Sequence, residues 1–434
     1  MFHLRMSVKT SLPCCMQIRT LPKNNQTEVY LLQYGSRNIV QKLAYSGFQL
    51  QEGVRKSTGL FPRTFGFLTP RRGNKGLVPI ELCGKRFCSS CTFVNKKVPV
   101  SFRVEPPWRI LFIGTDEFSL ETLKALNDAR LRDNHTLIEH LDVVALKLKK
   151  PCPVRKYADE NGLNVSDWPI GDKHNTYDVG VVSSFGRLIP ERVIHMFPYG
   201  ILNVHPSILP RWRGASPIAH CLLHNDAVTG VTITEIRPKH FDIGPILISE
   251  KISVPPKITR AQLEKTLAIR GGHLLVEALS DLHWLERFES EQDPSRITYA
   301  HKLHSDLAKV NWEWSMEEIF RKYRALHDLM DLKSQYRGQT IKFRNMVDID
   351  EIAGQISRIE EHDGHRSRPP GYAHFIPWAK TVCVKCGDGW VGFKTVIYRK
   401  TLPACQFNNG YLQSEKSEPL FYDEPEKLKM VHSI

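Results

Sequence analysis

The sequence predicts an α/β protein with a doubly wound, mostly parallel sheet, followed by a small C-terminal β-barrel. From Trp108 to about residue 295, short apolar runs alternate with amphipathic helical patterns, which is typical of a parallel sheet covered by helices. Beyond residue 330, short strand-like runs are separated by Gly and Pro, which favours a small barrel. The length of 434 residues also exceeds one typical domain and leaves room for two cores.

A strand, a glycine turn and a helix form the first predicted unit of the sheet. The apolar run from Arg109 to Thr115 ends near Gly114, and Asp116 is suited to cap a helix that extends to about Ala129. The turn lacks the G-x-G-x-x-G pattern, and the bulky residues after Gly114 would keep phosphate oxygens away from the backbone. We therefore expect no NAD or ATP site at this turn.

The remaining elements follow from the same periodicities. Ser315 and Glu318 have capping-box spacing at the start of one more helix, which reaches Met330. The other helices are predicted at residues 153–161, 190–196, 217–224 and 259–285. Strands of the first sheet are predicted at residues 143–148, 178–185, 200–205, 230–236 and 246–254, and strands of the barrel at residues 340–349, 355–359, 381–385 and 390–398.

The basic charge of the chain is concentrated at the N-terminus. Residues 1–105 contain 17 Lys or Arg and four acidic residues, so they account for +13 of the net charge of +14. A basic, acid-poor segment with interspersed Ser and Thr is typical of a mitochondrial transit peptide, and a disordered basic arm that binds RNA is the alternative. No apolar run of about 18 residues follows it, so we expect no membrane span. Localisation to the mitochondrial matrix is the prediction.

The ten cysteines raise the question of a metal site or disulfides. Cys83, Cys88 and Cys91 are spaced four and two residues apart, whereas Cys383 and Cys386 form a single C-x-x-C in a strand-like run. A four-ligand zinc site needs two well-formed pairs near each other. We therefore expect no metal, and free thiols in a reducing compartment.

The segment from Ile201 to Ile218 contains the strongest candidate for a catalytic site. Asn203 and His205 are two residues apart on a predicted strand and so project to the same side. Pro206 marks the C-terminal end of that strand, where ligands bind in open α/β sheets. A carboxamide beside an imidazole suits the stabilisation of a tetrahedral oxyanion, although a lone Asn or His at such a position is more often structural.

A carboxylate follows in the sequence F-D-I-G, at Asp242 before the next strand. An Asp beside a His favours one tautomer of the ring and stabilises its charged form. By itself this motif favours a turn or helix-cap role for Asp242. The three side chains become a coherent set only if the fold brings Asp242 to the same crevice as Asn203 and His205.

These motifs resemble those of the folate-dependent formyltransferases. The similarity includes N-V-H-P-S-I-L-P-R-W-R-G-A-S-P-I at residues 203–218, and it continues in order with S-F-G-R-L-I-P, T-G-V-T-I, F-D-I-G-P-I-L, T-Y-A-H-K-L and F-N-N-G-Y-L. It covers about residues 107–415. The resemblance implies a Rossmann-like domain followed by an OB-like barrel, with 10-formyltetrahydrofolate as the formyl donor and the α-amine of methionyl initiator tRNA as the acceptor.

The resemblance also implies roles for single residues. Asn203 and His205 would bind the formyl oxygen as it becomes an oxyanion, and Asp242 would orient His205 and assist proton removal from the amine. The folate site would be lined by five residues of the matching motifs, namely Phe185, Ser207, Ile208, Leu209 and Pro210. No metal is implied.

Two basic segments are candidates for contact with tRNA. Arg211, Trp212 and Arg213 follow the active strand, where cations beside an aromatic ring suit a splayed RNA end; packing of the ring and pairing of the arginines with acids is the structural alternative. Lys149 and Lys150 lie in a shorter loop, at residues 147–156, than the Gly- and Lys-rich loop of bacterial relatives. They are suited to phosphate contacts, and a solvated basic turn is the alternative.

The predicted organisation therefore has five parts. These are a basic extension (1–105), a catalytic formyltransferase domain (106–295), a linker (296–314), a tRNA-binding barrel (315–420) and a tail (421–434). We expect a monomer. Two other functions remain open from the sequence: formyl transfer to a small amine, and an RNA-binding relative that has lost activity.

Overall fold

The computed structural model describes most of the chain beyond residue 102. The described residues are 103, 105–132, 135–171, 176–238, 241–286, 289–352, 368–413 and 419–422, together with the backbone of residues 48–53 and 65–70. The chain divides into two compact units, Met1–Thr92 and Phe93–Ile434. In the first unit, β1 (Phe48–Gly53) pairs with β2 (Phe65–Pro70) as an antiparallel ladder.

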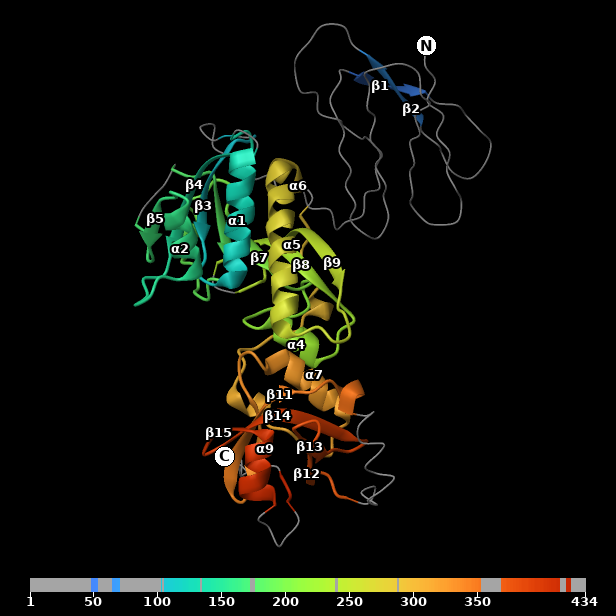
Figure 1. The fold of residues 1–434 in the computed structure, drawn as a ribbon. Helices are drawn as coiled ribbons and strands as arrows, with labels where there is room; N and C mark the ends of the chain where they lie inside the picture. Colours follow the sequence, from blue (N-terminus) through green and yellow to red (C-terminus); the bar gives the residue numbers. More distant parts are fainter. Residues whose placement is uncertain are drawn as a thin grey trace, which may run out of the picture. The chain divides into compact units, whose positions relative to one another are not determined.

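A seven-stranded sheet organises the N-terminal half of the second unit (Figure 1). Its strand order is β5-β4-β3-β6-β7-β8-β9. The strands from β5 to β7 pair in parallel, and β8 and β9 are antiparallel additions. Their bounds are β3 Trp108–Ile113, β4 Ile138–Ala145, β5 Val165–Asp167, β6 Val179–Ser183, β7 Ile201–His205, β8 Val228–Glu235 and β9 Ile246–Ser253.

Two long helices pack side by side on one face of this sheet, α1 (Glu117–Arg132) and α5 (Arg260–Ser280) (Figure 1). Adjacent glycines of α5 make this close approach possible. A Cβ on Gly272 would lie 2.8 Å from the Cβ of Ala125 in α1. A Cβ on Gly271 would lie 2.8 Å from Cγ1 of Val204 in β7, so this pair of glycines lets α5 contact both α1 and the sheet.

The two faces of the sheet have separate apolar cores. Leu202 and Val204 of β7 belong to the core under α1 and α5, whereas Ile201 belongs to the core on the opposite face. Shorter helices complete the coverage. They are α2 Pro153–Glu160, α3 Glu191–Ile194, α4 Pro217–Leu223 and α6 Leu282–Leu285.

The C-terminal half of the same unit is a six-stranded antiparallel sheet with its own core. Residues 419–422 join its two edges: Gln335 of β10 exchanges backbone hydrogen bonds with Tyr422, and Ala373 of β12 donates to Pro419 O. This segment closes the sheet into a small barrel. The strands are β10 Leu332–Tyr336, β11 Gln339–Met346, β12 Ala373–Ile376, β13 Thr381–Lys385, β14 Trp390–Tyr398 and β15 Lys400–Pro403.

Helix α7 (Met316–Leu326) precedes the barrel and packs against α4. Arg324 of α7 is buried and donates to Ile258 O and to Asn225 Oδ1. Beyond the helix, the Arg260 guanidinium of α5 forms a two-nitrogen ion pair with Asp328. Polar contacts therefore fix the start of the barrel region on the N-terminal half of the unit.

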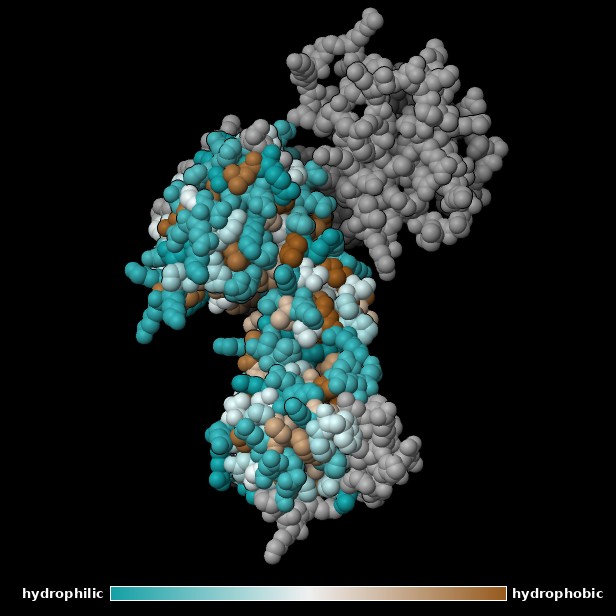
Figure 2. Space-filling model, in the orientation of Figure 1, coloured by the Kyte–Doolittle hydropathy of each residue, from teal (hydrophilic) through white to brown (hydrophobic). Residues whose placement is uncertain are grey.

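The surface view is largely hydrophilic over the described residues, with hydrophobic residues in small separate patches (Figure 2). Within the described ranges, none of the helices combines the length and the apolar character that a bilayer crossing needs.

The predicted fold class is confirmed. The predicted strand at residues 143–148 was placed too late, since β4 runs from Ile138 to Ala145 and its polar residues interrupt the apolar run. The predicted helix at 259–285 is divided at Asp281 into α5 and α6. Six short strands, β1, β2, β5, β10, β12 and β15, were missed, and the strand predicted at 355–359 lies outside the described residues.

Candidate active site

Strand β7 places Asn203 and His205 at the C-terminal end of the parallel strands. It lies between β6 and β8, with Asn203 opposite Thr234 and His205 opposite Thr232. The two side chains alternate with Leu202 and Val204, so they project to the opposite face of the sheet from the α5 core. His205 is only 4% exposed, so its polar atoms need partners within the protein or a ligand.

Asp242 reaches this position from the turn between β8 and β9. Its backbone has a φ of +55°, a left-handed conformation that Asp tolerates better than most residues but that is still uncommon. Gly244 follows, where a Cβ would lie 1.7 Å from the Glu235 carbonyl oxygen. The F-D-I-G sequence therefore forms a turn that only a glycine at position 244 permits, and the turn directs the Asp242 carboxylate toward β7.

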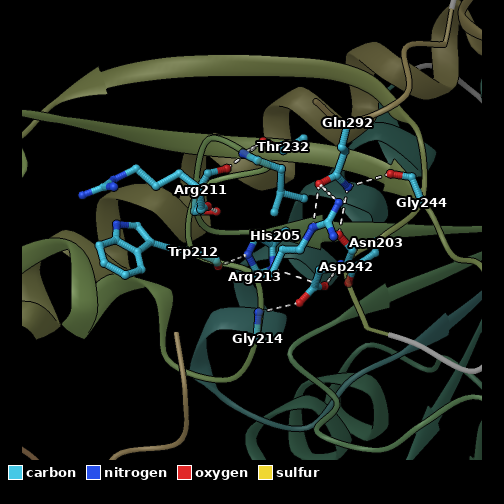
Figure 3. Close-up of polar contacts among 12 residues, drawn as sticks. Asn203, His205, Arg211, Trp212, Arg213, Gly214, Thr232, Asp242, Gly244 and Gln292 are labelled. Atoms are coloured by element: carbon cyan, nitrogen blue, oxygen red, sulfur yellow. Dashed lines mark hydrogen bonds and ion pairs between the residues drawn. The ribbon is translucent and has the colours of Figure 1, made fainter. Parts of the chain in front are cut away.

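The three predicted catalytic side chains converge (Figure 3). Asn203 Nδ2 donates to Asp242 Oδ1 at 3.2 Å, and His205 Nδ1 lies 3.4 Å from the same oxygen. The backbone N–H of Gly214 donates to Asp242 Oδ2 at 2.8 Å. The carboxylate is therefore fixed between the strand and the loop that follows it.

The His205 ring lies between two oxygens that can only accept hydrogen bonds. Nε2 is 2.9 Å from the carbonyl oxygen of Trp212, and Nδ1 faces Asp242. A neutral imidazole has one N–H, whereas the charged ring has two and satisfies both contacts. Asp242 and the Trp212 carbonyl therefore fix the orientation of the ring.

The side chain of Gln292 holds the turn that carries Asp242. Gln292 Nε2 donates to the carbonyl oxygens of Asp242 at 2.8 Å and of Gly244 at 2.7 Å. Its Oε1 accepts from two nitrogens of the buried Arg213 guanidinium, at 2.9 and 2.7 Å. One glutamine thus links the 241–244 turn to the loop after β7 (Figure 3).

The trio opens into a cavity of about 500 Å³, a size typical of small-molecule sites. The cavity extends to both faces of the sheet. Val182, Phe185 and Ile189 line it from the core on the α3 face, and Phe118 and Ile218 from the core under α1 and α5. Asn203, His205 and Asp242 are part of the same lining.

Only one of the five residues predicted to bind folate lines the cavity. Phe185 lines the cavity. In the described part of the chain, the lining does not include residues 207–210, which form a buried loop: Ser207 Oγ donates to Arg211 O, and Thr232 Oγ1 donates to Ser207 O and accepts from the Leu209 N–H. Ile208 and Pro210 lie in the same loop. A folate contact by this loop stays a prediction.

The predicted RNA-binding residues of the same loop have partners within the protein. Asp226 accepts from Arg211 Nε at 2.8 Å and from the Trp212 indole N–H at 2.7 Å. The Arg211 guanidinium lies over the Trp212 ring, and Arg213 binds Gln292. These contacts correspond to the structural alternative for the three residues, and their contact with RNA stays a prediction.

Lys149 and Lys150 are exposed in the loop after β4. Nearby, Asp167 accepts from Arg155 and lies 3.8 Å from Lys147 Nζ. Phosphate binding by Lys149 and Lys150 also stays a prediction.

Three contributors to the site were missed from the sequence: the side chain of Gln292, the backbone N–H of Gly214 and the carbonyl oxygen of Trp212. The two backbone groups have no side-chain signature. Gln292 lies in a polar stretch that resembles any surface connection. A usable signal was the neighbouring motif T-Y-A-H-K-L, since Thr298 Oγ1 accepts from Trp212 N and Ala300 N donates to Arg213 O.

The described residues contain no cluster of three or more potential metal ligands. Cys383 and Cys386 are buried, and burial raises the pKa of each thiol to about 12. In the absence of a metal ion, these two thiols are therefore protonated near neutral pH. Cys83, Cys88 and Cys91 lie outside the described residues.

Comparisons with known proteins agree with this geometry. Residues 110–279 match the family model of the formyl transferases and residues 302–412 match the model of the formyl transferase C-terminal domain. Together these two matches span most of the described chain. The chain belongs to the formyl transferase family.

Within that family, the similarity is to the methionyl-tRNA formyltransferases. The mitochondrial enzyme of Mus musculus is 44% identical over 72% of this chain and 80% of its own length. The enzyme of Homo sapiens is 43% identical over 71% of this chain and 79% of its own length. The methionyl-tRNA formyltransferase of Carboxydothermus hydrogenoformans is 34% identical over 54% of this chain and 78% of its own length.

Proposed function

We propose that this enzyme transfers the formyl group of 10-formyltetrahydrofolate to the α-amine of methionyl initiator tRNA during mitochondrial translation initiation. The observation that carries this proposal is the convergence of Asn203, His205 and Asp242 on one cavity. The relatives named above supply the acceptor and the compartment. Localisation in the matrix and a monomeric state are parts of the same proposal.

The first step is the attack of the neutral amine on the formyl carbon. A new C–N bond forms, and the carbonyl electrons move to the formyl oxygen. The Asn203 amide has two hydrogens, of which one donates to Asp242, so the other is suited to the oxyanion. His205 lies on the same side of β7, with its ring held by Asp242 and the Trp212 carbonyl oxygen. A preorganised donor of this kind contributes about 3–4 kcal/mol to transition-state stabilisation.

Proton movement completes the reaction. The attacking nitrogen becomes positive and must lose a proton, which the Asp242 carboxylate is suited to accept. When the tetrahedral intermediate collapses, the bond between the formyl carbon and N10 of the folate breaks, and N10 takes up the proton that Asp242 accepted from the amine. The Gly214 and Gln292 contacts to Asp242 fix its position throughout, as proximity effects require.

The domain roles are part of the proposal. Residues 106–295 form the catalytic domain, and residues 296–314 link it to a tRNA-binding barrel. The barrel extends from residue 315 to Tyr422, two residues beyond the predicted end at 420, because Phe421 is in its core and Tyr422 pairs with β10. Residues 423–434 form a tail, and residues 1–105 direct the protein to mitochondria. Lys149 and Lys150 contribute phosphate contacts. Phe185 contributes to the folate site, because it belongs to the cavity lining on the face to which Asn203 and His205 point.

A formylation assay tests the proposal. The purified full-length chain is incubated with 10-formyltetrahydrofolate and, in parallel, with methionyl initiator tRNA or with small amines such as an amino sugar nucleotide. Formyl-methionyl-tRNA is the expected product, and acid-stable labelled formyl on the methionine measures it. Formylation of the small amine alone, or no transfer at all, contradicts the proposal.

A further inference from the structure

The linker, residues 296–314, runs beside the loop that follows β7. Arg213 of this loop and Tyr299 of the linker form a parallel bridge. Arg213 N donates to Thr298 O at 2.9 Å, and Ala300 N donates to Arg213 O at 2.7 Å. The linker therefore forms a short ladder of backbone hydrogen bonds with the residues that come directly after the catalytic strand.

This ladder leaves no space between the two segments. Ala300 is fully buried, and its carbonyl oxygen accepts from Ser216 N at 3.2 Å. Gly214 has a φ of +116°, and a Cβ at this position would lie 2.8 Å from the same carbonyl oxygen. The N–H of Gly214 is the group that donates to Asp242. The linker thus packs directly on backbone that holds a predicted catalytic side chain.

Trp212 is the strained residue of the loop. Its φ is +64°, a left-handed conformation in which a bulky side chain is a genuine outlier and which persists only where surrounding contacts determine it. The Asp226 carboxylate holds the indole. The backbone has a partner at each end: Thr298 Oγ1 accepts from the Trp212 N–H at 2.9 Å, and the Trp212 carbonyl oxygen lies 2.9 Å from His205 Nε2. A linker hydroxyl and the His205 ring therefore bind the same strained residue.

We propose that Thr298 is a positioning residue for formyl transfer, because its hydroxyl holds Trp212 in the orientation that keeps the Trp212 carbonyl oxygen on His205. This inference rests on the proposed function. Thr298 is outside the lining of the cavity, so it acts through Trp212 and not on a substrate. The linker thereby contributes to the geometry of the catalytic site in addition to joining two domains.

Loss of the Thr298 hydroxyl should release this arrangement. The Trp212 N–H would lose its acceptor, and the left-handed backbone would relax toward a more common conformation. Its carbonyl oxygen would then turn away from His205, which leaves one side of the ring without a partner. A misplaced catalytic group slows the chemical step, whereas substrate contacts in the cavity remain. The expected signature is a lower kcat with nearly constant KM values.

The first test replaces Thr298 in the full-length enzyme. Thr298→Val keeps the shape of the side chain and removes the hydroxyl. We expect kcat to fall about tenfold, the equivalent of one hydrogen bond, and the KM values for methionyl-tRNA and 10-formyltetrahydrofolate to stay within about twofold. Thr298→Ala removes the same acceptor with a smaller side chain, so the same loss is expected even if valine does not fit. Thr298→Ser keeps the hydroxyl and should restore kcat.

A buried threonine elsewhere provides the matched control. Thr122 of α1 is fully buried, its Oγ1 lies 3.1 Å from Ser183 Oγ, and it is outside the cavity lining. Thr122→Val should lower the unfolding free energy, because it leaves a buried hydroxyl without a partner, and should leave kcat unchanged. Far-UV circular dichroism and thermal unfolding show that each variant is folded at the assay temperature.

A double-mutant cycle tests whether Thr298 acts through His205. In the His205→Ala background the ring that the Trp212 carbonyl orients is absent. Thr298→Val should therefore lower the residual kcat by about twofold or less, compared with about tenfold in the unmodified enzyme, since residues of one contact chain are not additive.

The outcomes separate this inference from the proposed function. If the unmodified enzyme forms no formyl-methionyl-tRNA, the proposed function is wrong. If it does, three results overturn the role of Thr298: a normal kcat for Thr298→Val and Thr298→Ala, a loss that Thr298→Ser does not restore, or an undiminished tenfold loss in the His205→Ala background. A higher KM for methionyl-tRNA with kcat unchanged also overturns it, because Thr298 would then contact the tRNA.

Discussion

Two groups of polar side chains near the end of β7 differ in what they contact. Asn203 and His205 face Asp242 across an open cavity. Arg211, Trp212 and Arg213 follow within ten residues, yet their donors bind Asp226 and Gln292 inside the protein. Residue type alone does not separate the two groups. What separates them is access to the cavity, because Asn203, His205 and Asp242 belong to its lining and residues 211–213 do not.

The largest expected effect tests the first group. Asn203→Ala, His205→Ala and Asp242→Asn should each lower kcat by about two to three orders of magnitude, because each removes part of a preorganised oxyanion or proton-transfer site. Single-turnover formylation measures the rate, and far-UV circular dichroism should show an unchanged fold. Asn164→Ala, at an exposed amide that donates to Asp142, is the control with near-normal turnover. Near-normal rates for all three variants would show that Asn203, His205 and Asp242 are not needed for formyl transfer.

Gln292 contacts both groups, through the Asp242 backbone and the Arg213 guanidinium. Its replacement should therefore change both turnover and stability. Gln292→Ala removes the acceptor of the buried Arg213 guanidinium, and an unsatisfied group of this kind costs about 2–3 kcal/mol of unfolding free energy. The carbonyls of Asp242 and Gly244 also lose their donor, so we expect turnover to fall about tenfold, the equivalent of one hydrogen bond. Urea denaturation and steady-state kinetics measure the two effects.

Gln292→Glu sharpens this result. A carboxylate still accepts from Arg213 but cannot donate to the two carbonyls. Relative to Gln292→Ala, Gln292→Glu should therefore restore the unfolding free energy more fully than the turnover rate. Equal recovery of both would mean that the carbonyl contacts have no separate catalytic effect, and Gln413→Ala at an exposed position should change neither quantity.

Asp226 tests the second group, Arg211, Trp212 and Arg213, because its carboxylate accepts from Arg211 and Trp212. Asp226→Ala leaves the Trp212 indole N–H without its acceptor and should lower the unfolding free energy by about 2 kcal/mol. The Arg211 side chain is 43% exposed, so its coupling to Asp226 in a double-mutant cycle should be only about 1 kcal/mol or less. Thermal unfolding of Asp226→Ala, Arg211→Ala and the double variant provides the cycle.

The same variants decide between the structural and the RNA-binding interpretations. If Arg211 acts only within the fold, Arg211→Ala should leave the KM for methionyl-tRNA and its salt dependence unchanged. A phosphate contact would instead lower the slope of log KM against log salt by about one. That outcome would assign Arg211 to tRNA binding rather than to the stability of the fold.

The smallest expected effect concerns Lys149 and Lys150. Replacing both by Ala should raise the KM for methionyl-tRNA about threefold, lower the salt slope by about two and leave the KM for the folate constant, because phosphate contacts are electrostatic and additive. Salt-dependent kinetics between low and physiological ionic strength measure this. The exposed pair Lys251 and Lys265, replaced together, is the control. An unchanged slope would leave the 147–156 loop as a solvated turn.

The sequence by itself determined the fold class and predicted Asn203, His205 and Asp242 as the catalytic residues. Strand periodicity placed Asn203 and His205 on one side of a strand, Pro206 marked its end, and the motif order supplied Asp242. These features are local, since alternation and termination of a strand depend on residues a few positions apart. Short strands such as β5 and β15 could not be found in this way, because pairing with a neighbour rather than pattern length defines them.

Only the tertiary structure decided which polar groups remain available to a substrate. Arg213 and Gln292 lie 79 positions apart in the chain, and Leu329 reaches the cavity from a segment that follows the catalytic region. No local pattern encodes such contacts, because they form when elements distant in sequence pack together. The sequence therefore predicted the chemistry at residues 203, 205 and 242, and packing determined the support for Asp242 and the cavity beside it.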